Sequence, residues 1–270
     1  MTAQQPGIIE AALQYLANDE GLAVYIASAG GGEILPHEGN YLMQKVMVRN
    51  GRNRKFDLDR EGFKLVLRPT RVSDFYDDSQ IAAVYESEIE ALVKEQTGAM
   101  RVEIFDHTRR ATSDQVRKAR KTREPASIVH NDYTADSAPK RLRDHHPDDA
   151  EALPGRRFAI VNVWRPIRGP VPNFPLAFCD ASSVASGDLV PVKRQAEDRI
   201  GEIQLALYNP SHSWYYFPAM RTEEALLFKT YDSATDGRAR FTPHTSFADP
   251  TAADQAPPRE SIETRCFVFY

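Results

Sequence analysis

Apolar and polar positions alternate along much of this chain in short blocks, a pattern typical of β-strands. Residues 42–48 and 63–68 alternate in this way, and residues 100–105 follow the same rule. From residue 157 onward, short apolar blocks recur between turns rich in Pro and Gly, at 158–164, 176–180, 203–208, 214–217, 225–231, 244–247 and 261–270. Many short strands separated by turns predict a closed or double-sheet β-fold, and we expect a double-stranded β-helix, or jelly roll.

Two segments have a different periodicity. Residues 8–18 mix Ile, Ala, Leu and Tyr in a pattern that predicts a short amphipathic helix. Residues 73–99 carry apolar side chains at helical spacing with acidic and polar residues between them, which predicts the main long helix, packed on the outside of a sheet. The expected class is therefore mainly β with flanking helices. We expect one domain over residues 1–270, with helices and outer strands in 1–110 and the jelly-roll core in 111–270.

Composition narrows the functional class. The formal net charge of −4 gives no general reason to expect a nucleic acid or an anionic membrane as partner. Cys179 and Cys266 have neither metal-ligand spacing nor a disulfide framework, which fits a reducing compartment. No apolar stretch approaches the roughly 20 residues needed to span a bilayer, and no signal peptide is visible at the N-terminus. We expect a cytoplasmic protein that acts on a small molecule; nothing indicates a homo-oligomer.

The strongest chemical signal combines a tripeptide with residues far downstream. His130-Asn131-Asp132 ends an apolar run, His244 follows more than a hundred residues later, and Arg259-Glu260-Ser261 opens the last apolar run. Side chains alternate along a strand, so His130 and Asp132 should share one face. Two imidazoles and one carboxylate are the ligands of a non-heme Fe(II) site that leaves coordination positions open. This order of residues indicates an iron site, located in residues 111–270, the part of the chain that we expect to form the core.

The chain resembles the non-heme Fe(II)/2-oxoglutarate-dependent oxygenases of the CmcJ/NvfI type, a group of hydroxylases and desaturases of specialised metabolism. The resemblance is strong in the C-terminal half and loose in the N-terminal half, and its segments are residues 129–134, 162–166, 231–233, 241–247 and 258–265. The distance between Asp132 and His244 is longer than in many relatives, which we interpret as insertions around 136–157 and 168–212. The resemblance implies a cupin-like jelly roll that uses Fe(II), 2-oxoglutarate and molecular oxygen to hydroxylate, desaturate or cyclise a small metabolite, in secondary-metabolite biosynthesis.

The resemblance also implies roles for individual residues. Fe(II) would be bound by His130, Asp132 and His244, and the distal carboxylate of 2-oxoglutarate by Arg259 and Ser261, because a guanidinium fork suits a carboxylate. Asn162 and Tyr133 are further candidates for contacts with the cosubstrate or metal-bound groups. Trp164 and Arg165 are candidates for substrate contacts, although Arg165 should point to the strand face opposite Asn162 and Trp164.

Several alternatives stay open at this stage. Arg265, six residues beyond Arg259, competes with it as the carboxylate partner. The fold could instead serve a non-catalytic jelly-roll protein that binds a metal or ligand, or an Fe(II) oxidase that does not use 2-oxoglutarate. The basic run at 107–123 is typical of a solvated face, but part of it could recognise an anionic substrate. The His-His-x-Asp-Asp string at 145–149 is better explained as a surface helix or loop, and the triple glycine at 30–32 as a flexible turn.

Overall fold

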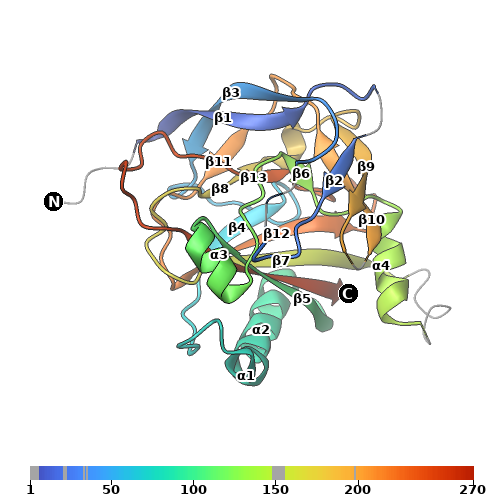
Figure 1. The fold of residues 1–270 in the computed structure, drawn as a ribbon. Helices are drawn as coiled ribbons and strands as arrows, with labels where there is room; N and C mark the ends of the chain where they lie inside the picture. Colours follow the sequence, from blue (N-terminus) through green and yellow to red (C-terminus); the bar gives the residue numbers. More distant parts are fainter. Residues whose placement is uncertain (1–5, 21–22, 33, 35, 148–155, 198) are drawn as a thin grey trace.

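Two β-sheets face each other and enclose the centre of the molecule (Figure 1). The computed structural model describes the chain apart from residues 1–5, 21–22, 33, 35, 148–155 and 198. One sheet has nine strands in the order β1-β3-β11-β8-β13-β6-β10-β9-β2, and the other has five in the order β4-β12-β7-β14-β5. Strands distant in sequence thus lie side by side, and the predicted jelly-roll class is confirmed.

The elements follow one another in this order along the chain. The strands are β1 (Ile8–Leu16), β2 (Val24–Ile26), β3 (Tyr41–Asn50), β4 (Phe63–Leu67), β5 (Arg101–Ala111), β6 (His130–Asn131), β7 (Phe158–Pro166), β8 (Leu176–Cys179), β9 (Leu189–Gln195), β10 (Ile200–Ala206), β11 (Trp214–Tyr216), β12 (Glu224–Asp232), β13 (His244–Ser246) and β14 (Glu260–Phe269). The helices are α1 (Asp78–Gln80), the π-helical turn η1 (Ile81–Tyr85), α2 (Glu86–Thr97), α3 (Asp114–Arg120), α4 (Ser137–His145) and the 3-10 turn η2 (Ala181–Ser183).

Strand β14, which lies between β7 and the edge strand β5, separates two environments because its side chains alternate between the sheet faces. Ile262, Cys266 and Val268 are buried in the apolar cluster beneath helix α2. The odd-numbered side chains between Ser261 and Arg265 point the other way, toward the space between the sheets, where Arg265 contacts Asp132. One strand thus supplies apolar side chains to the core and polar side chains to the interior of the roll.

A single helical stretch covers the outer face of the five-stranded sheet (Figure 1). Ile89, Leu92 and Val93 of α2 are fully buried, and they pack with strand residues such as Val161. The long helix predicted for residues 73–99 is confirmed, but it begins only at Asp78, where the side chain of Asp77 accepts a hydrogen bond from the backbone N–H of Ser79.

The helix predicted for residues 8–18 is wrong, because this segment forms strand β1, which pairs antiparallel with β3. Every second side chain from Ile9 to Tyr15 is buried, and the residues between are exposed or half-buried. That two-residue period was present in the sequence. Ala11, Ala12 and Leu13 favour helices intrinsically, but pairing along nine residues of β3 outweighs this weak preference.

The predicted strands are present; most ends shift by a few residues, but β5 continues from the predicted 100–105 to Ala111, into the basic run. Four elements were not predicted: β9, the short helix α3 inside the basic run, the three-residue strand β2 and the turn η2. The N-terminal 110 residues contribute to both sheets, since β1 and β3 belong to one and β4 and β5 to the other. Within the described residues, no helix is long and apolar enough to cross a membrane.

The packing of α2 on the sheet predicts that Leu92→Ala lowers the free energy of unfolding by about 2–5 kcal/mol, because the cavity it leaves is lined by a close-packed core. Chemical denaturation measures this loss. Glu95→Ala, which removes an ion pair with Arg68 and an exposed hydrogen bond from the Gln96 side chain, should change stability by less than about 1 kcal/mol. Equal effects of the two substitutions would contradict the assignment of α2 to the core.

Candidate metal centre and cosubstrate site

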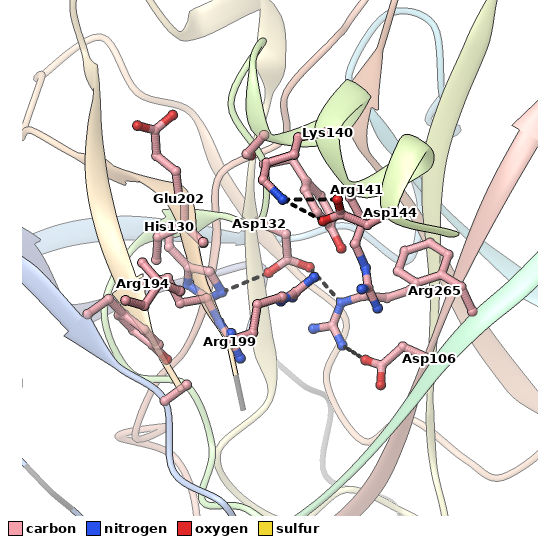
Figure 2. A pocket seen from close by; sticks show the side chains of 18 of the residues that line it. Asp106, His130, Asp132, Lys140, Arg141, Asp144, Arg194, Arg199, Glu202 and Arg265 are labelled. Atoms are coloured by element: carbon pink, nitrogen blue, oxygen red, sulfur yellow. Dashed lines mark hydrogen bonds and ion pairs between the residues drawn. The ribbon is translucent and has the colours of Figure 1, made fainter. Parts of the chain in front are cut away.

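Two neighbouring strands bring the predicted ligands together. His130 of β6 lies directly opposite His244 of β13 in the antiparallel register, and their ring centroids are 4.4 Å apart. Ligand atoms of His130, Asp132 and His244 all lie within 4.8 Å of one another, so the three could hold a metal ion. His130 and Asp132 line one cavity, and Figure 2 shows their side chains close together there.

Hydrogen bonds to the backbone select the tautomer of both imidazoles. The Nδ1 atom of His130 lies 2.7 Å from the carbonyl oxygen of Ile128, and that of His244 lies 3.0 Å from the carbonyl oxygen of Thr242. A carbonyl only accepts, so each Nδ1 must carry the proton and donate. In the neutral form of such a ring, Nε2 carries the lone pair that a metal requires. Burial, followed by the neighbouring His130, lowers the pKa of His244 to about 3, which keeps this ring neutral.

The Asp132 carboxylate is oriented from one side. Its Oδ2 accepts hydrogen bonds from Asn162 Nδ2 at 2.7 Å and from Arg265 Nε at 3.0 Å. Its Oδ1 is directed instead toward His130, with Nε2 at 3.6 Å. Burial alone would raise the pKa of Asp132, but the Arg265 guanidinium beside it holds that pKa well below the usual range. The carboxylate is therefore charged and presents one free oxygen to the histidines.

Arg265 is fully engaged with protein carboxylates. Besides Asp132, its guanidinium pairs with Asp106 and Glu263 and donates to the Thr108 hydroxyl. These contacts occupy most of its donors and hold it against Asp132. An arginine so engaged has little capacity left for the carboxylate of a cosubstrate.

Arg259 has the opposite character. It is 1% exposed, and only its Nη1 has partners, the Phe174 carbonyl and the Ser246 hydroxyl. Its Nε and Nη2 are buried without a partner among the described residues, as is the nearby hydroxyl of Ser261. Burial, followed by repulsion from Arg110, lowers the pKa of Arg259 to about 9, so the group is still charged at neutral pH. Buried donors without partners are costly, and a bound carboxylate would satisfy them.

The other predicted residues divide by strand face. Trp164 packs against Arg259, whose guanidinium carbon is 5.6 Å from the ring centroid, and its indole Nε1 is also buried without a described partner. Asn162 lies on the same face and holds Asp132. Arg165 points to the other face, where it donates to backbone carbonyls and lies over Tyr85, so the structure does not bring it to the cluster. Tyr133 lines the cavity.

Two other sequence features stay away from the cluster. His145 packs against the rings of Phe105 and Phe267, and His146 pairs with Glu103 at 2.7 Å. The remaining part of the His-His-x-Asp-Asp string lies outside the described residues. The triple glycine forms a bend against Lys121, with Gly30 and Gly31 at positive φ, in agreement with the predicted turn.

Comparison with known proteins identifies the family. Residues 13–269 match a family model described as an oxidoreductase/YMDC permease-like domain. The hydroxylase/desaturase CTB9 of Cercospora beticola is 36% identical, over 89% of this chain and 81% of that protein. The alpha-ketoglutarate-dependent dioxygenase phiK of a fungal species is 31% identical, over 98% of both chains. The solved structure of the iron and alpha-ketoglutarate-dependent endoperoxidase NvfI covers 97% of this chain, with a TM-score of 0.84 and 29% identity.

This chain belongs to the Fe(II)/2-oxoglutarate-dependent oxygenase family. It is thus an enzyme, and its cofactors are Fe(II), 2-oxoglutarate and dioxygen. The two alternatives, a non-catalytic jelly-roll protein and an oxidase without 2-oxoglutarate, are less well supported than the oxygenase.

The sequence did not predict the roles of several residues that surround His130, Asp132 and His244. Arg265 was considered only as a partner for the cosubstrate, yet it orients Asp132, and Glu263 beside it was not considered. The two-residue period of β14, which puts Arg259, Glu263 and Arg265 on one face, could have revealed this set. Arg194 gave no signal, because it lies on the unpredicted strand β9.

The network around Arg265 predicts that Arg265→Met destabilises the metal-free enzyme by about 3–5 kcal/mol, because it leaves three carboxylates without their shared cation. Affinity for Fe(II) should also fall by about tenfold or more, since Asp132 loses a partner that orients it. Denaturation and anaerobic Fe(II) titration measure both effects. Arg101→Met, at an exposed position of β5, is the control, and a similarly small effect at Arg265 would show that the network is dispensable.

Proposed function

We propose that His130, Asp132 and His244 bind the catalytic Fe(II) of this oxygenase through Nε2, Oδ1 and Nε2. The observation that carries this assignment is the convergence of three donor atoms from two neighbouring strand ends, each ligand with its other polar atom already hydrogen-bonded elsewhere. Three protein ligands from two adjacent strand ends leave the remaining positions open on the cavity side. Asn162 and Arg265 act as positioning residues that keep Asp132 charged and turned toward the metal.

We further propose that Arg259 and Ser261 bind the distal carboxylate of 2-oxoglutarate. The two unsatisfied guanidinium nitrogens and the unsatisfied hydroxyl support this, and Trp164 Nε1 adds another donor beside them. Arg265, the competing candidate, is already paired with three carboxylates. The cosubstrate would therefore bind along the inner face of β14 and β7, with its keto acid end toward the histidines.

The substrate is a small organic metabolite, and hydroxylation, desaturation and ring formation are the proposed reaction classes, in the biosynthesis of a secondary metabolite. Bound Fe(II) and 2-oxoglutarate supply the oxidising chemistry, with succinate as coproduct. The protein contributes the shape and polarity of the cavity and the exclusion of bulk water. The two cysteines are buried and unpaired, which supports the cytoplasm as the proposed location.

Each of His130→Ala, Asp132→Ala and His244→Ala should lose Fe(II) binding and succinate formation while the fold is retained, because the two sheets do not need the ion to pack. Anaerobic Fe(II) titration, succinate analysis and circular dichroism provide the three measurements. His37→Ala, which removes a histidine outside the cluster, is the control. A variant that still forms succinate at a near-normal rate would remove that residue from the ligand set.

Arg259→Ala should raise the Kd for 2-oxoglutarate well over tenfold, because a buried charge-assisted pair is worth about 2–5 kcal/mol. Arg259→Lys should be intermediate, since an ammonium cannot reproduce the planar fork, and Ser261→Ala should have a smaller effect. The Fe(II)–2-oxoglutarate charge-transfer band measures the affinity in the absence of oxygen.

The control for this experiment is Arg168→Ala, an exposed arginine that pairs with Glu260 next to the same site. If 2-oxoglutarate affinity is normal in Arg259→Ala but lost in Arg265→Ala at full iron occupancy, the competing assignment is correct. If neither arginine matters, the enzyme binds its cosubstrate elsewhere.

A further inference from the structure

The cavity beside the candidate metal centre has a cationic wall that the proposed iron and cosubstrate sites do not use. The cavity has a volume of about 430 Å³. Figure 2 shows Arg194 and Arg199 reaching into it on the side of His130, and Lys140 and Arg141 entering from helix α4. Arg110 and Arg123 line it from the end of β5 and the segment after α3.

Several of these cations lack a counter-ion. In the cavity, Lys140 pairs with Asp144, and Arg265 pairs with Asp106 and Asp132. By contrast, the side chains of Arg123 and Arg194 form no ion pair and no hydrogen bond with any residue that the structure describes. Both are half-buried at the cavity wall.

The unpaired arginines also repel one another. Burial, followed by the neighbouring Arg110 and Arg265, lowers the pKa of Arg123. Burial, followed by Arg265 and then Arg123, lowers the pKa of Arg194. A group of cations that is partly removed from water and held close together is unfavourable in the empty cavity, and a bound anion would offset that cost.

The arginines lie close to the metal centre. Tyr25 of β2 is stacked on the His130 ring at a centroid distance of 6.0 Å, and it pairs directly with Arg194 across the β2–β9 ladder. Arg123 is bridged to Arg110 by backbone pairing. An anion between these arginines would thus be separated from His130 by about the width of one aromatic side chain.

From this arrangement we propose that the substrate carries a carboxylate, and that Arg123 and Arg194 bind it so that the rest of the molecule lies over the metal centre. The inference rests on the proposed function, and it names the substrate class of that site. The cavity is lined by seven Lys and Arg side chains and six Asp and Glu side chains, a net of one positive charge. That balance suits a singly charged group, and the planar fork of arginine suits a carboxylate.

The test uses a matched pair of probes, 2-naphthylacetate and its neutral analogue 2-naphthylacetamide. Binding to the anaerobic Fe(II)–2-oxoglutarate enzyme is followed by naphthyl fluorescence and by the perturbation of the charge-transfer band. The acid should bind about tenfold or more tightly than the amide. Arg123→Gln and Arg194→Gln should each weaken acid binding several-fold without affecting the amide, and the double variant should abolish the preference.

Two substitutions of nearby cations serve as controls. Lys193→Gln changes an exposed residue next to Arg194 on β9, and Arg120→Gln changes the basic run outside this cavity, where the guanidinium lies over Tyr76. Both should retain the preference for the acid. Equal binding of acid and amide, or a preference that survives the double variant, would overturn the proposal.

The remaining outcomes separate this proposal from the proposed function. Loss of 2-oxoglutarate affinity in Arg123→Gln and Arg194→Gln would show that the arginines serve the cosubstrate, and would overturn the substrate assignment. If the wild-type enzyme forms no charge-transfer band, the assigned iron and cosubstrate sites fail. The acid–amide comparison is then made by calorimetry on the metal-free protein, where a lost preference in the double variant supports the carboxylate site and an unchanged one overturns it.

Discussion

The charged contact between Asp132 and Arg265 is the interaction on which the architecture of the site depends. Both side chains are largely buried, so neither charge would be stable without the other. Their pairing, with Asn162 as a second donor, leaves one aspartate oxygen free and facing His130. Arg265 and Asn162 come from β14 and β7, which pair directly at these two residues. The inner face of the five-stranded sheet thereby sets the geometry of a ligand that follows β6 in the opposite sheet.

The same inner face gives the proposed cosubstrate site its character. Arg265 of β14 pairs with three carboxylates. Arg259, immediately before this strand, is buried and has donors without partners among the described residues. Buried donors without partners are tolerated where a ligand accepts their hydrogen bonds. This contrast supports the proposed roles of the two arginines, Arg259 as a partner of the cosubstrate and Arg265 as a partner of Asp132. On the outer face, apolar side chains of helix α2 pack against those of β14.

The cavity wall is assembled from distant parts of the chain. Helix α4, the segment after α3, and strands β5 and β9 each contribute charged side chains, whereas the proposed metal ligands lie on, or directly after, the paired strands β6 and β13. Family membership fixes the iron and 2-oxoglutarate chemistry, whereas the selection of the substrate is the role that we propose for this wall. One fold can support many activities in this way, because the residues around a shared site differ from one protein to the next.

The sequence alone determined the β-class, the long helix and the order of His130, Asp132 and His244, because strand alternation and helical spacing are local properties that can be read in a single chain. The sequence did not determine secondary structure where strand pairing decides it: the segment predicted as a helix at 8–18 forms strand β1 because it pairs with β3. Only the tertiary structure separated Arg259 from Arg265, since the difference between them is the set of partners that each one meets. Arginines from β5, β9 and α4 line one cavity for the same reason: contacts across sheets depend on how distant segments fold together.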